Sequence, residues 1–343
     1  MTINEILKEL TPEMKKDDNI KQFLTEFIIR SKDGNWIQTK NGNGIVELNK
    51  ENGTLITTVL TDDDYIASYP NTMDCNISNR CSNNCEFCYQ GCTPNGKEAD
   101  LRSFVESDFF KSFKPGMELA LNGNDPFHKD LEFFLTRCKE MSLIPNLTVR
   151  YNTFVKNKDL LKKWQDEGLL YGIGISVQSN MDFSQFECFK NVVFHTIHGI
   201  TGADIFEDLF KNRSKVLILG YKDIGLGVDY REKMPLDIIS KQDYVIRNIS
   251  NWIKSVKNGT GFSVLSFDNL AIKQIDVESL LNESEWQRFY RGDEGTTSCY
   301  IDLVDMTYSV NSLSSKINRY LIDLSASVEN MFDDVKNKRY YIE

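Results

Sequence analysis

The chain has 343 residues, with 40 Lys and Arg against 50 Asp and Glu and a formal net charge of −10. Its 41% hydrophobic and 26% charged residues are typical of a globular protein and exclude wholesale disorder. The acidic balance argues against non-specific nucleic-acid binding, which needs a basic surface. No apolar run approaches the roughly 18 residues that cross a bilayer. The first residues contain Glu5 and Glu9 and show no secretory signal. We therefore expect a soluble, cytoplasmic protein without a membrane span.

The first 66 residues are expected to form an N-terminal extension. A helical pattern begins at about Asp18, with apolar residues recurring at spacings of three and four. Short strand-like runs follow near residue 36, at 45–48 and at 55–60. Asn52-Gly53 between the last two runs is a strong hairpin signal. Residues 1–66 are therefore predicted to fold as a helix with short β hairpins.

Residues 67–258 alternate between strand-like and helical patterns. Six strand candidates lie at residues 72–77, 117–121, 146–150, 171–177, 192–197 and 215–219. Strands that alternate with helices at this spacing pair in parallel through right-handed crossovers. The pattern predicts an α/β fold, a partial (βα)6 TIM-like barrel two units short of the closed barrel of eight. Residues 259–343 are expected to add a C-terminal α+β appendage on the substrate side, with strands at 262–267 and 299–304 and a helical tail.

Cysteine spacing is the most informative feature of the sequence. Five of the eight cysteines lie between residues 75 and 92, and a chain of this size without an export signal is a poor candidate for a disulfide framework. Clustered thiols in a reducing compartment more often bind a metal or carry out redox chemistry. Cys81, Cys85 and Cys88 have the spacing CxxxCxxC. Such a loop can place three thiolates around one face of a 4Fe-4S cluster and leave one iron for a non-protein ligand.

This segment resembles the signature of the radical S-adenosylmethionine (radical SAM) superfamily, CxxxCxφC, with Phe87 as the aromatic residue φ. The resemblance implies that Cys81, Cys85 and Cys88 are the catalytic, metal-binding residues and that SAM chelates the fourth iron. It also implies reductive cleavage of SAM to a 5'-deoxyadenosyl radical, which abstracts hydrogen from the substrate. The cofactors then carry the chemistry, and the protein positions them and excludes side reactions.

The resemblance further implies which residues near the first two strands contact SAM. Phe87 and Tyr89 are expected to flank the adenine. The family has a glycine-rich segment after the second strand that holds the SAM amino group. Here that place is taken by Asn122-Gly123-Asn124-Asp125, in which Asn124 replaces a glycine and Asp125 replaces a glutamate. Aspartate keeps the anion that an ammonium group needs, but it has a shorter reach than glutamate.

Residues after the later strands complete the SAM site that the resemblance implies. Ser176 and Gln178 follow the fourth strand, where the family places polar groups near the SAM ribose and carboxylate. His195 begins a segment that partly matches the GxIxGxxE-like pattern of the fifth strand. Gly220 and Tyr221, at the end of the sixth strand, are expected to offer backbone groups to the adenine. All these positions fall at the carboxyl ends of strands, where barrel enzymes keep their active sites.

Partners follow from the same resemblance. Reductive SAM cleavage requires an electron at very low potential, so we expect a donor of the flavodoxin or ferredoxin type. The substrate is predicted to be a peptide or protein, with a nucleoside or nucleotide as the second choice, and other small molecules stay open. Only Cys299 lies beyond Cys188, so no cysteine-rich auxiliary-cluster domain is expected at the C-terminus. Whether Cys299 or His195 takes part in the chemistry is open at this level.

A second hypothesis assigns the cysteine loop a structural role. In this view Cys75 or Cys92 completes a four-thiolate set, and the chain is a non-catalytic binding protein stabilised by zinc or by a cluster. Structural zinc sites are closed by four protein ligands, whereas reactive sites keep an open position. The fourth ligand therefore separates the two hypotheses.

Overall fold

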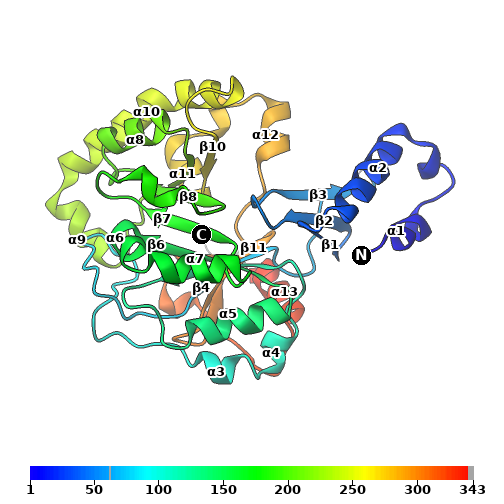
Figure 1. The fold of residues 1–343 in the computed structure, drawn as a ribbon, viewed down its shortest axis with the longest axis horizontal. Coiled ribbons are helices and arrows are strands. Elements are labelled where there is room, and N and C mark those ends of the chain that lie inside the picture. The colour runs from blue at the N-terminus through cyan, green and yellow to red at the C-terminus, as the bar shows by residue number, and fades with distance from the viewer. Residues whose placement is uncertain (62, 339–343) are drawn as a thin grey trace.

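The computed structural model describes residues 1–61 and 63–338. Figure 1 shows a small N-terminal unit, drawn in blue, beside a larger body in which helices surround a twisted sheet. The N-terminal unit contains α1 (Ile3–Glu9), the short 3-10 helix η1 (Met14–Lys16), α2 (Asp18–Lys32), β1 (Trp36–Asn41), β2 (Gly44–Asn49) and β3 (Leu55–Val59). Its strands form an antiparallel sheet in the order β1-β2-β3. The predicted helix and hairpins are therefore confirmed.

One buried asparagine fastens the N-terminal sheet to the body. Asn41, at the end of β1, is 1% exposed. Its Nδ2 donates to the carbonyl of Tyr69 and to Oδ1 of Asn71, both at 2.8 Å. Its Oδ1 accepts from the amides of Ser68 and Tyr69 at 2.8 and 3.1 Å. Because both the Nδ2 and the Oδ1 of Asn41 have hydrogen-bond partners, its burial costs little free energy. These bonds fix the direction in which the chain enters the body.

The body is built on a sheet of ten strands in the described part of the chain. The strands are β4 (Thr72–Asn76), β5 (Glu118–Gly123), β6 (Ile144–Arg150), β7 (Gly172–Ser176), β8 (Val192–Ile197), β9 (Lys215–Leu219), β10 (Val264–Phe267), β11 (Ser298–Asp302), β12 (Thr307–Ser309) and β13 (Tyr320–Leu321). Their order is β10-β9-β8-β7-β6-β5-β4-β11-β12-β13. Neighbours from β10 to β11 are parallel, and β12 and β13 continue antiparallel.

This sheet confirms the predicted α/β class and the mostly parallel partial barrel. All six predicted strands are present as β4 to β9. The C-terminal segment adds one parallel strand at each end of these six, with β10 beside β9 and β11 beside β4. Sequence reading had assigned these two strands to the appendage, because which strands pair across such long separations is not visible in local patterns.

Helices surround the sheet (Figure 1). They are α3 (Leu101–Phe104), α4 (Asp108–Lys111), α5 (Leu131–Glu140), α6 (Tyr151–Lys156), α7 (Lys158–Asp166), α8 (Ala203–Lys211), α9 (Leu226–Lys233), α10 (Pro235–Lys257), α11 (Asn269–Ile275), α12 (Glu283–Phe289) and α13 (Val328–Lys338), with 3-10 turns η2 (Phe183–Phe186), η3 (Glu278–Leu280) and η4 (Lys316–Asn318). None of these helices in the described residues is long and apolar enough to span a membrane.

Side-chain alternation along the strands separates the core from the interior of the barrel. On β5, Leu119 and Leu121 are buried in the main hydrophobic core, whereas Ala120 and Asn122 face inward and line a cavity. The core also takes in Cys75, Cys138 and Cys299, so these three thiols lie among apolar side chains. Successive side chains of a strand point to opposite faces, so side chains of a strand between the core and the cavity alternate between the two. The inward positions are therefore the ones available for a site.

Candidate functional site

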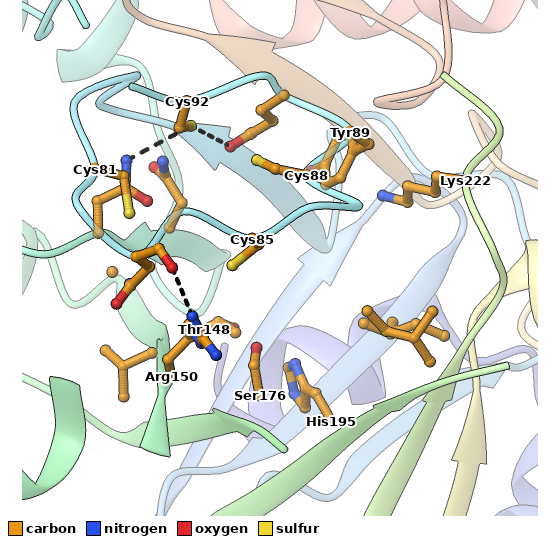
Figure 2. Close-up of a pocket in the computed structure, with 18 of the residues that line it drawn as sticks. Cys81, Cys85, Cys88, Tyr89, Cys92, Thr148, Arg150, Ser176, His195 and Lys222 are labelled. Carbon is orange, nitrogen blue, oxygen red and sulfur yellow. Dashed lines mark hydrogen bonds between the residues drawn. The ribbon is translucent and has the colours of Figure 1, made fainter. Parts of the chain in front are cut away.

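A cavity of about 370 Å³ opens at the carboxyl ends of the parallel strands. Inward-facing residues at or near the ends of successive strands form part of its wall: Asn76, Asn122, Arg150, Ser176 and His195. The loop that follows β4 forms another part, and Figure 2 shows its cysteines around one end of the cavity. The cavity therefore lies where parallel α/β barrels keep their active sites.

The structure brings almost all of the predicted site residues together. The cavity wall includes Cys81, Cys85, Phe87, Cys88, Tyr89, Asn122, Gly123, Asn124, Ser176, Gln178, His195, Gly220 and Tyr221. Asp125 is the predicted residue that does not line it. Its Oδ1 accepts a hydrogen bond from Nζ of Lys156 at 2.9 Å, in an ion pair near the surface. Its carbonyl accepts from the amide of Ser82 at 2.7 Å, so Asp125 braces the cysteine loop.

Backbone hydrogen bonds close the cysteine loop at a narrow neck. The amide of Asn79 donates to the carbonyl of Lys97 at 2.8 Å, and the amide of Thr93 donates to the carbonyl of Asn79 at 3.0 Å. The amide of Cys81 in turn donates to the carbonyl of Thr93 at 2.8 Å. A Cβ on Gly96 would lie 1.9 Å from the carbonyl oxygen of Asn79. The neck therefore requires glycine at this position, and it holds both ends of the loop in register.

The donor set of the loop fits an iron-sulfur cluster. Cys81 is buried and Cys85, Cys88 and Cys92 are half-buried, and all four line the cavity. Within residues 1–61 and 63–338, no set of three or more His, Cys, Asp or Glu side chains is arranged around a single metal ion. A cubane is larger than one ion, so its thiolate ligands stand apart around a space. Thiolates are also the usual protein ligands of such clusters.

The thiols have distinct electrostatic environments. Burial raises the pKa of Cys85, and the guanidinium of Arg150 and a hydrogen bond from Gln178 oppose this effect. Arg150 is held by a 2.7 Å hydrogen bond from Nη1 to the carbonyl of Asn83 (Figure 2). A hydrogen bond with the Cys92 thiol lowers the pKa of Cys88 to about 6, although burial raises it. The same contact raises the pKa of Cys92, so Cys88 is the preferred thiolate of this pair.

This difference predicts a pH dependence in the metal-free protein. An ordinary thiol ionises near pH 8.5, but Cys88 should already be a thiolate above about pH 6. Because the thiolate is the nucleophile, its alkylation by iodoacetamide should rise as pH increases through about 6 and then level off. Peptide mapping by mass spectrometry measures this rate at Cys88. Cys92→Ala removes the donor and should move the inflection to higher pH; an unchanged inflection would contradict the assignment.

Cys92 lies against Cys88, with which its thiol forms a hydrogen bond. Its Sγ lies 3.6 Å from Oε1 of Gln90 and 3.9 Å from Nδ2 of Asn124 (Figure 2). Cys92 thus contacts one of the predicted ligands directly, and it is the thiol that would complete a four-cysteine set.

Asn122 and Asn124 both use their side chains to hold the base of the cysteine loop. Nδ2 of each residue donates to the carbonyl of Ser78 at 2.7 Å. Oδ1 of Asn122 accepts from the amide of Ile77 at 2.8 Å. The resemblance assigns this segment to the SAM amino group, whereas its amides here connect β5 to the loop after β4.

Two further predicted residues, Ser176 and His195, line the cavity from β7 and β8. Ser176 and His195 lie next to each other below Cys85 (Figure 2). Burial lowers the pKa of His195 to about 4, so its imidazole is neutral at neutral pH. Gly174 makes room for this ring, since a Cβ there would lie 2.6 Å from Cε1 of His195. His198, the other histidine of this segment, is buried and does not line the cavity.

The backbone groups expected to bind adenine already have partners inside the protein. The amide of Gly220 donates to Oδ1 of Asp268 at 2.9 Å. The amide and carbonyl of Tyr221 bond to the side chain of Gln274 at 2.8 and 2.9 Å. An adenine contact at these groups would compete with these bonds. Phe87 packs edge-on against Tyr230, with ring centroids 5.8 Å apart.

Three charged residues of the cavity wall were not among the predicted site residues. Asp74, Arg150 and Lys222 all line the cavity. Arg150 ends β6, and the rule that barrel sites lie at the carboxyl ends of strands could have found it. Lys222 Nζ donates to Oγ of Ser312 at 2.8 Å and lies 3.9 Å from the centre of the Tyr89 ring (Figure 2). Asp74 is the single charged residue of β4 and lies at its centre, which is itself a signal.

Comparisons with known proteins support the fold. No protein-family model matches the sequence, and no curated protein matches it. Among solved structures, the chain is similar to SuiB of Streptococcus suis, whose crystal structure contains bound S-adenosylmethionine. The TM-score is 0.55 at 13% sequence identity, and the match covers 89% of this chain and 88% of SuiB. The similarity therefore extends over nearly the whole of both chains, and this chain shares the fold of a protein that binds SAM.

Proposed function

We propose that this chain is a radical SAM enzyme that binds a 4Fe-4S cluster through Cys81, Cys85 and Cys88 and binds SAM in the adjoining cavity. The observation that carries the proposal is the position of the CxxxCxφC loop: it closes over a cavity at the carboxyl ends of parallel strands. Similarity to a protein solved with SAM bound agrees with it. When bound and reduced, the cluster and SAM would supply a 5'-deoxyadenosyl radical that abstracts a hydrogen atom from the substrate.

The residues of this chain would position SAM and keep water and solvent-borne reactants away. Arg150 brings positive charge next to Cys85, where three thiolates would otherwise accumulate negative charge. Thr148 and Ser176 line the cavity, and their hydroxyls can serve as donors and acceptors for the polar groups of SAM. His195 is neutral, so it can hydrogen-bond to SAM or substrate without adding charge. Phe87 and Tyr89 would flank the adenine.

A peptide or protein is the substrate class we favour, ahead of a nucleoside or nucleotide. A second cavity of about 370 Å³ shares four residues with the first: Asn76, Tyr89, Gln90 and Tyr300. Its outer wall comes from residues 312–316 and Arg319 of the C-terminal segment. Two adjoining cavities can hold an extended chain, with one residue at the reacting position and its neighbours outside. An electron donor of the flavodoxin or ferredoxin type completes the proposed system.

The experiment that tests the proposal is electron paramagnetic resonance (EPR) of protein reconstituted without oxygen and reduced with dithionite. With SAM added, the signal of a reduced 4Fe-4S cluster should change, because SAM would bind the iron that no cysteine holds. Release of 5'-deoxyadenosine is the second readout. A protein that contains zinc and gives no EPR signal, or a cluster that ignores SAM, would overturn the catalytic assignment.

One observation favours a second candidate function. The contact between Cys92 and Cys88 gives the loop a fourth thiol, as a closed structural site requires. In that case the chain would be a binding protein stabilised by zinc or by a four-thiolate cluster, without SAM chemistry.

A further inference from the structure

The carboxylate of Asp74 faces the cavity without a partner. Asp74 lies in the middle of β4, between Tyr300 of β11 and Ala120 of β5 in the register of the sheet. Its accessible surface opens into the cavity. Within residues 1–61 and 63–338, its side chain makes no hydrogen bond and no ion pair. The small side chain of Ala120 leaves space on one side, and the hydroxyl of Tyr300 is directed to Oδ2 of Asp302, 3.3 Å away.

The two other charged residues of the cavity wall are already engaged. Lys222 donates to Ser312 and lies over the Tyr89 ring. It influences Asp74 electrostatically, but no ion pair within 4 Å joins them in the described residues. Arg150 is bonded to the carbonyl of Asn83. Asp74 is therefore the charged group of the described wall that still lacks a direct partner.

Neighbouring acidic side chains show what a satisfied carboxylate looks like in this interior. Glu118, two residues before Ala120 on β5, accepts from Oγ1 of Thr72 at 3.3 Å and from Nδ2 of Asn146 at 2.6 Å. Asp268 accepts from two backbone amides at 2.9 and 2.7 Å. Burial raises the pKa of Asp74, as it does for Glu118 and Asp268, so what distinguishes Asp74 within the described residues is the lack of a direct hydrogen-bond partner. A carboxylate without a direct partner is costly to remove from water, and a cation bound in the cavity would offset that cost.

We infer that Asp74 receives a cationic nitrogen of the substrate, an alkylammonium or a guanidinium group. This inference rests on the proposed function, because it assigns the same cavity to the substrate. A positive charge is the complementary partner of a carboxylate that faces a cavity without a direct partner, and charge-assisted hydrogen bonds are the stronger kind. Ile197, Leu217 and Leu219 also line the cavity, so apolar surface is present for the hydrocarbon part of such a group. The substrate would then carry an amine or guanidine side chain.

Stability of the reconstituted full-length protein gives the first test. Asp74→Asn keeps the shape and removes the charge, so we expect the melting temperature at neutral pH to rise by about 2 °C. Asp302→Asn is the matched control, because Asp302 is paired with Arg319 at 2.9 Å in the same interior. That variant should melt at a lower temperature. A lower melting temperature for Asp74→Asn would show that Asp74 is structural and would overturn the inference.

Binding of a simple cation gives the second test. Butylammonium chloride should raise the melting temperature of the wild type with saturation, as a ligand of the native state does. Butanol and sodium chloride should not, and neither should butylammonium with Asp74→Asn. No saturable effect on the wild type, or an equal effect on the variant, would overturn the inference.

The SAM-dependent EPR change separates this inference from the proposed function. If the wild type shows no such change, the proposed function fails, while the melting experiments still decide whether Asp74 binds a cation. If Asp74→Asn alone loses the change, Asp74 belongs to the SAM site and the inference is overturned. Retention of the change in both proteins, together with the expected melting results, supports it.

Discussion

A Cys85→Ala variant should contain almost no cluster iron after reconstitution and should release no 5'-deoxyadenosine above background, whereas Cys92→Ala should keep both. The reason is that the proposed cluster takes its three protein ligands from Cys81, Cys85 and Cys88, and loss of one leaves two irons without a thiolate. Cys92 contacts Cys88 but is not one of the three. Iron and sulfide analysis, together with EPR before and after SAM addition, measures the difference.

The pair of variants is needed because Cys85→Ala alone does not discriminate between the two functions. Loss of metal on removal of Cys85 fits a three-thiolate cluster and a four-thiolate structural site equally. Cys92→Ala separates them, since a closed four-thiolate site loses as much metal from either variant. Equal losses, with zinc in the wild type, would therefore contradict the catalytic proposal. Cys188→Ala is the matched control, because Cys188 is exposed and does not line the cavity.

Central strands could be predicted from sequence because each carries a local signature. β8 and β9 match the predicted residues 192–197 and 215–219 at both ends. Strands of a parallel sheet are covered by helices, so they read as short apolar runs bounded by polar or glycine residues. The positions of β10 and β11 could not be read in this way. Asp302 pairs with Asn76, for example, and pairing across such a separation depends on the assembled sheet.

The residues of the candidate site also divide into those that local sequence predicts and those that only the assembled fold reveals. Cysteine spacing is local, so the position of the loop at the site could be predicted, and the resemblance to the radical SAM superfamily pointed to Ser176 and His195, which line the cavity. Asn124 and Asp125 are different. The hydrogen-bond partners of their side chains come from other segments of the chain and are known only once the fold is known. Asn124 binds the carbonyl of Ser78, and Asp125 binds Lys156. A motif position therefore predicts proximity to the site better than it predicts the contact.

Asp74 illustrates the opposite error, a residue that a motif search passes over. It lies between Met73 and Cys75, both buried in the core, and no pattern marks it as functional. Its charge at the centre of a strand was visible in the sequence, but its lack of a partner was not. Whether a buried carboxylate is satisfied depends on side chains from other strands, as the bonds of Glu118 to Thr72 and Asn146 show.

The geometry of the loop neck determines whether the three cysteines face the cavity at all. The hydrogen bonds between residues 79–81 and residues 93–97 bring the two ends of the loop together. Gly96 lies against this contact, where a Cβ would meet three backbone atoms of Asn79 and Arg80 at 1.9 to 2.7 Å. Backbone atoms cannot rotate away as a flexible side chain can. A methyl group at this position must therefore separate the two halves of the neck.

Gly96→Ala should accordingly lose most of its cluster although every cysteine is intact. Overpacking of this kind costs about 3 kcal/mol, which shifts the ratio of closed to open neck by about a hundredfold. Gly91→Ala is the matched control in the same loop: its φ of +61° adds strain, but no atom lies within 4 Å of the new methyl group, so the expected cost is about 1 kcal/mol. Iron content after reconstitution measures both variants. Full cluster loading in Gly96→Ala would show that the cysteines reach the cluster without the neck, and thiol spacing alone would then be sufficient for the site.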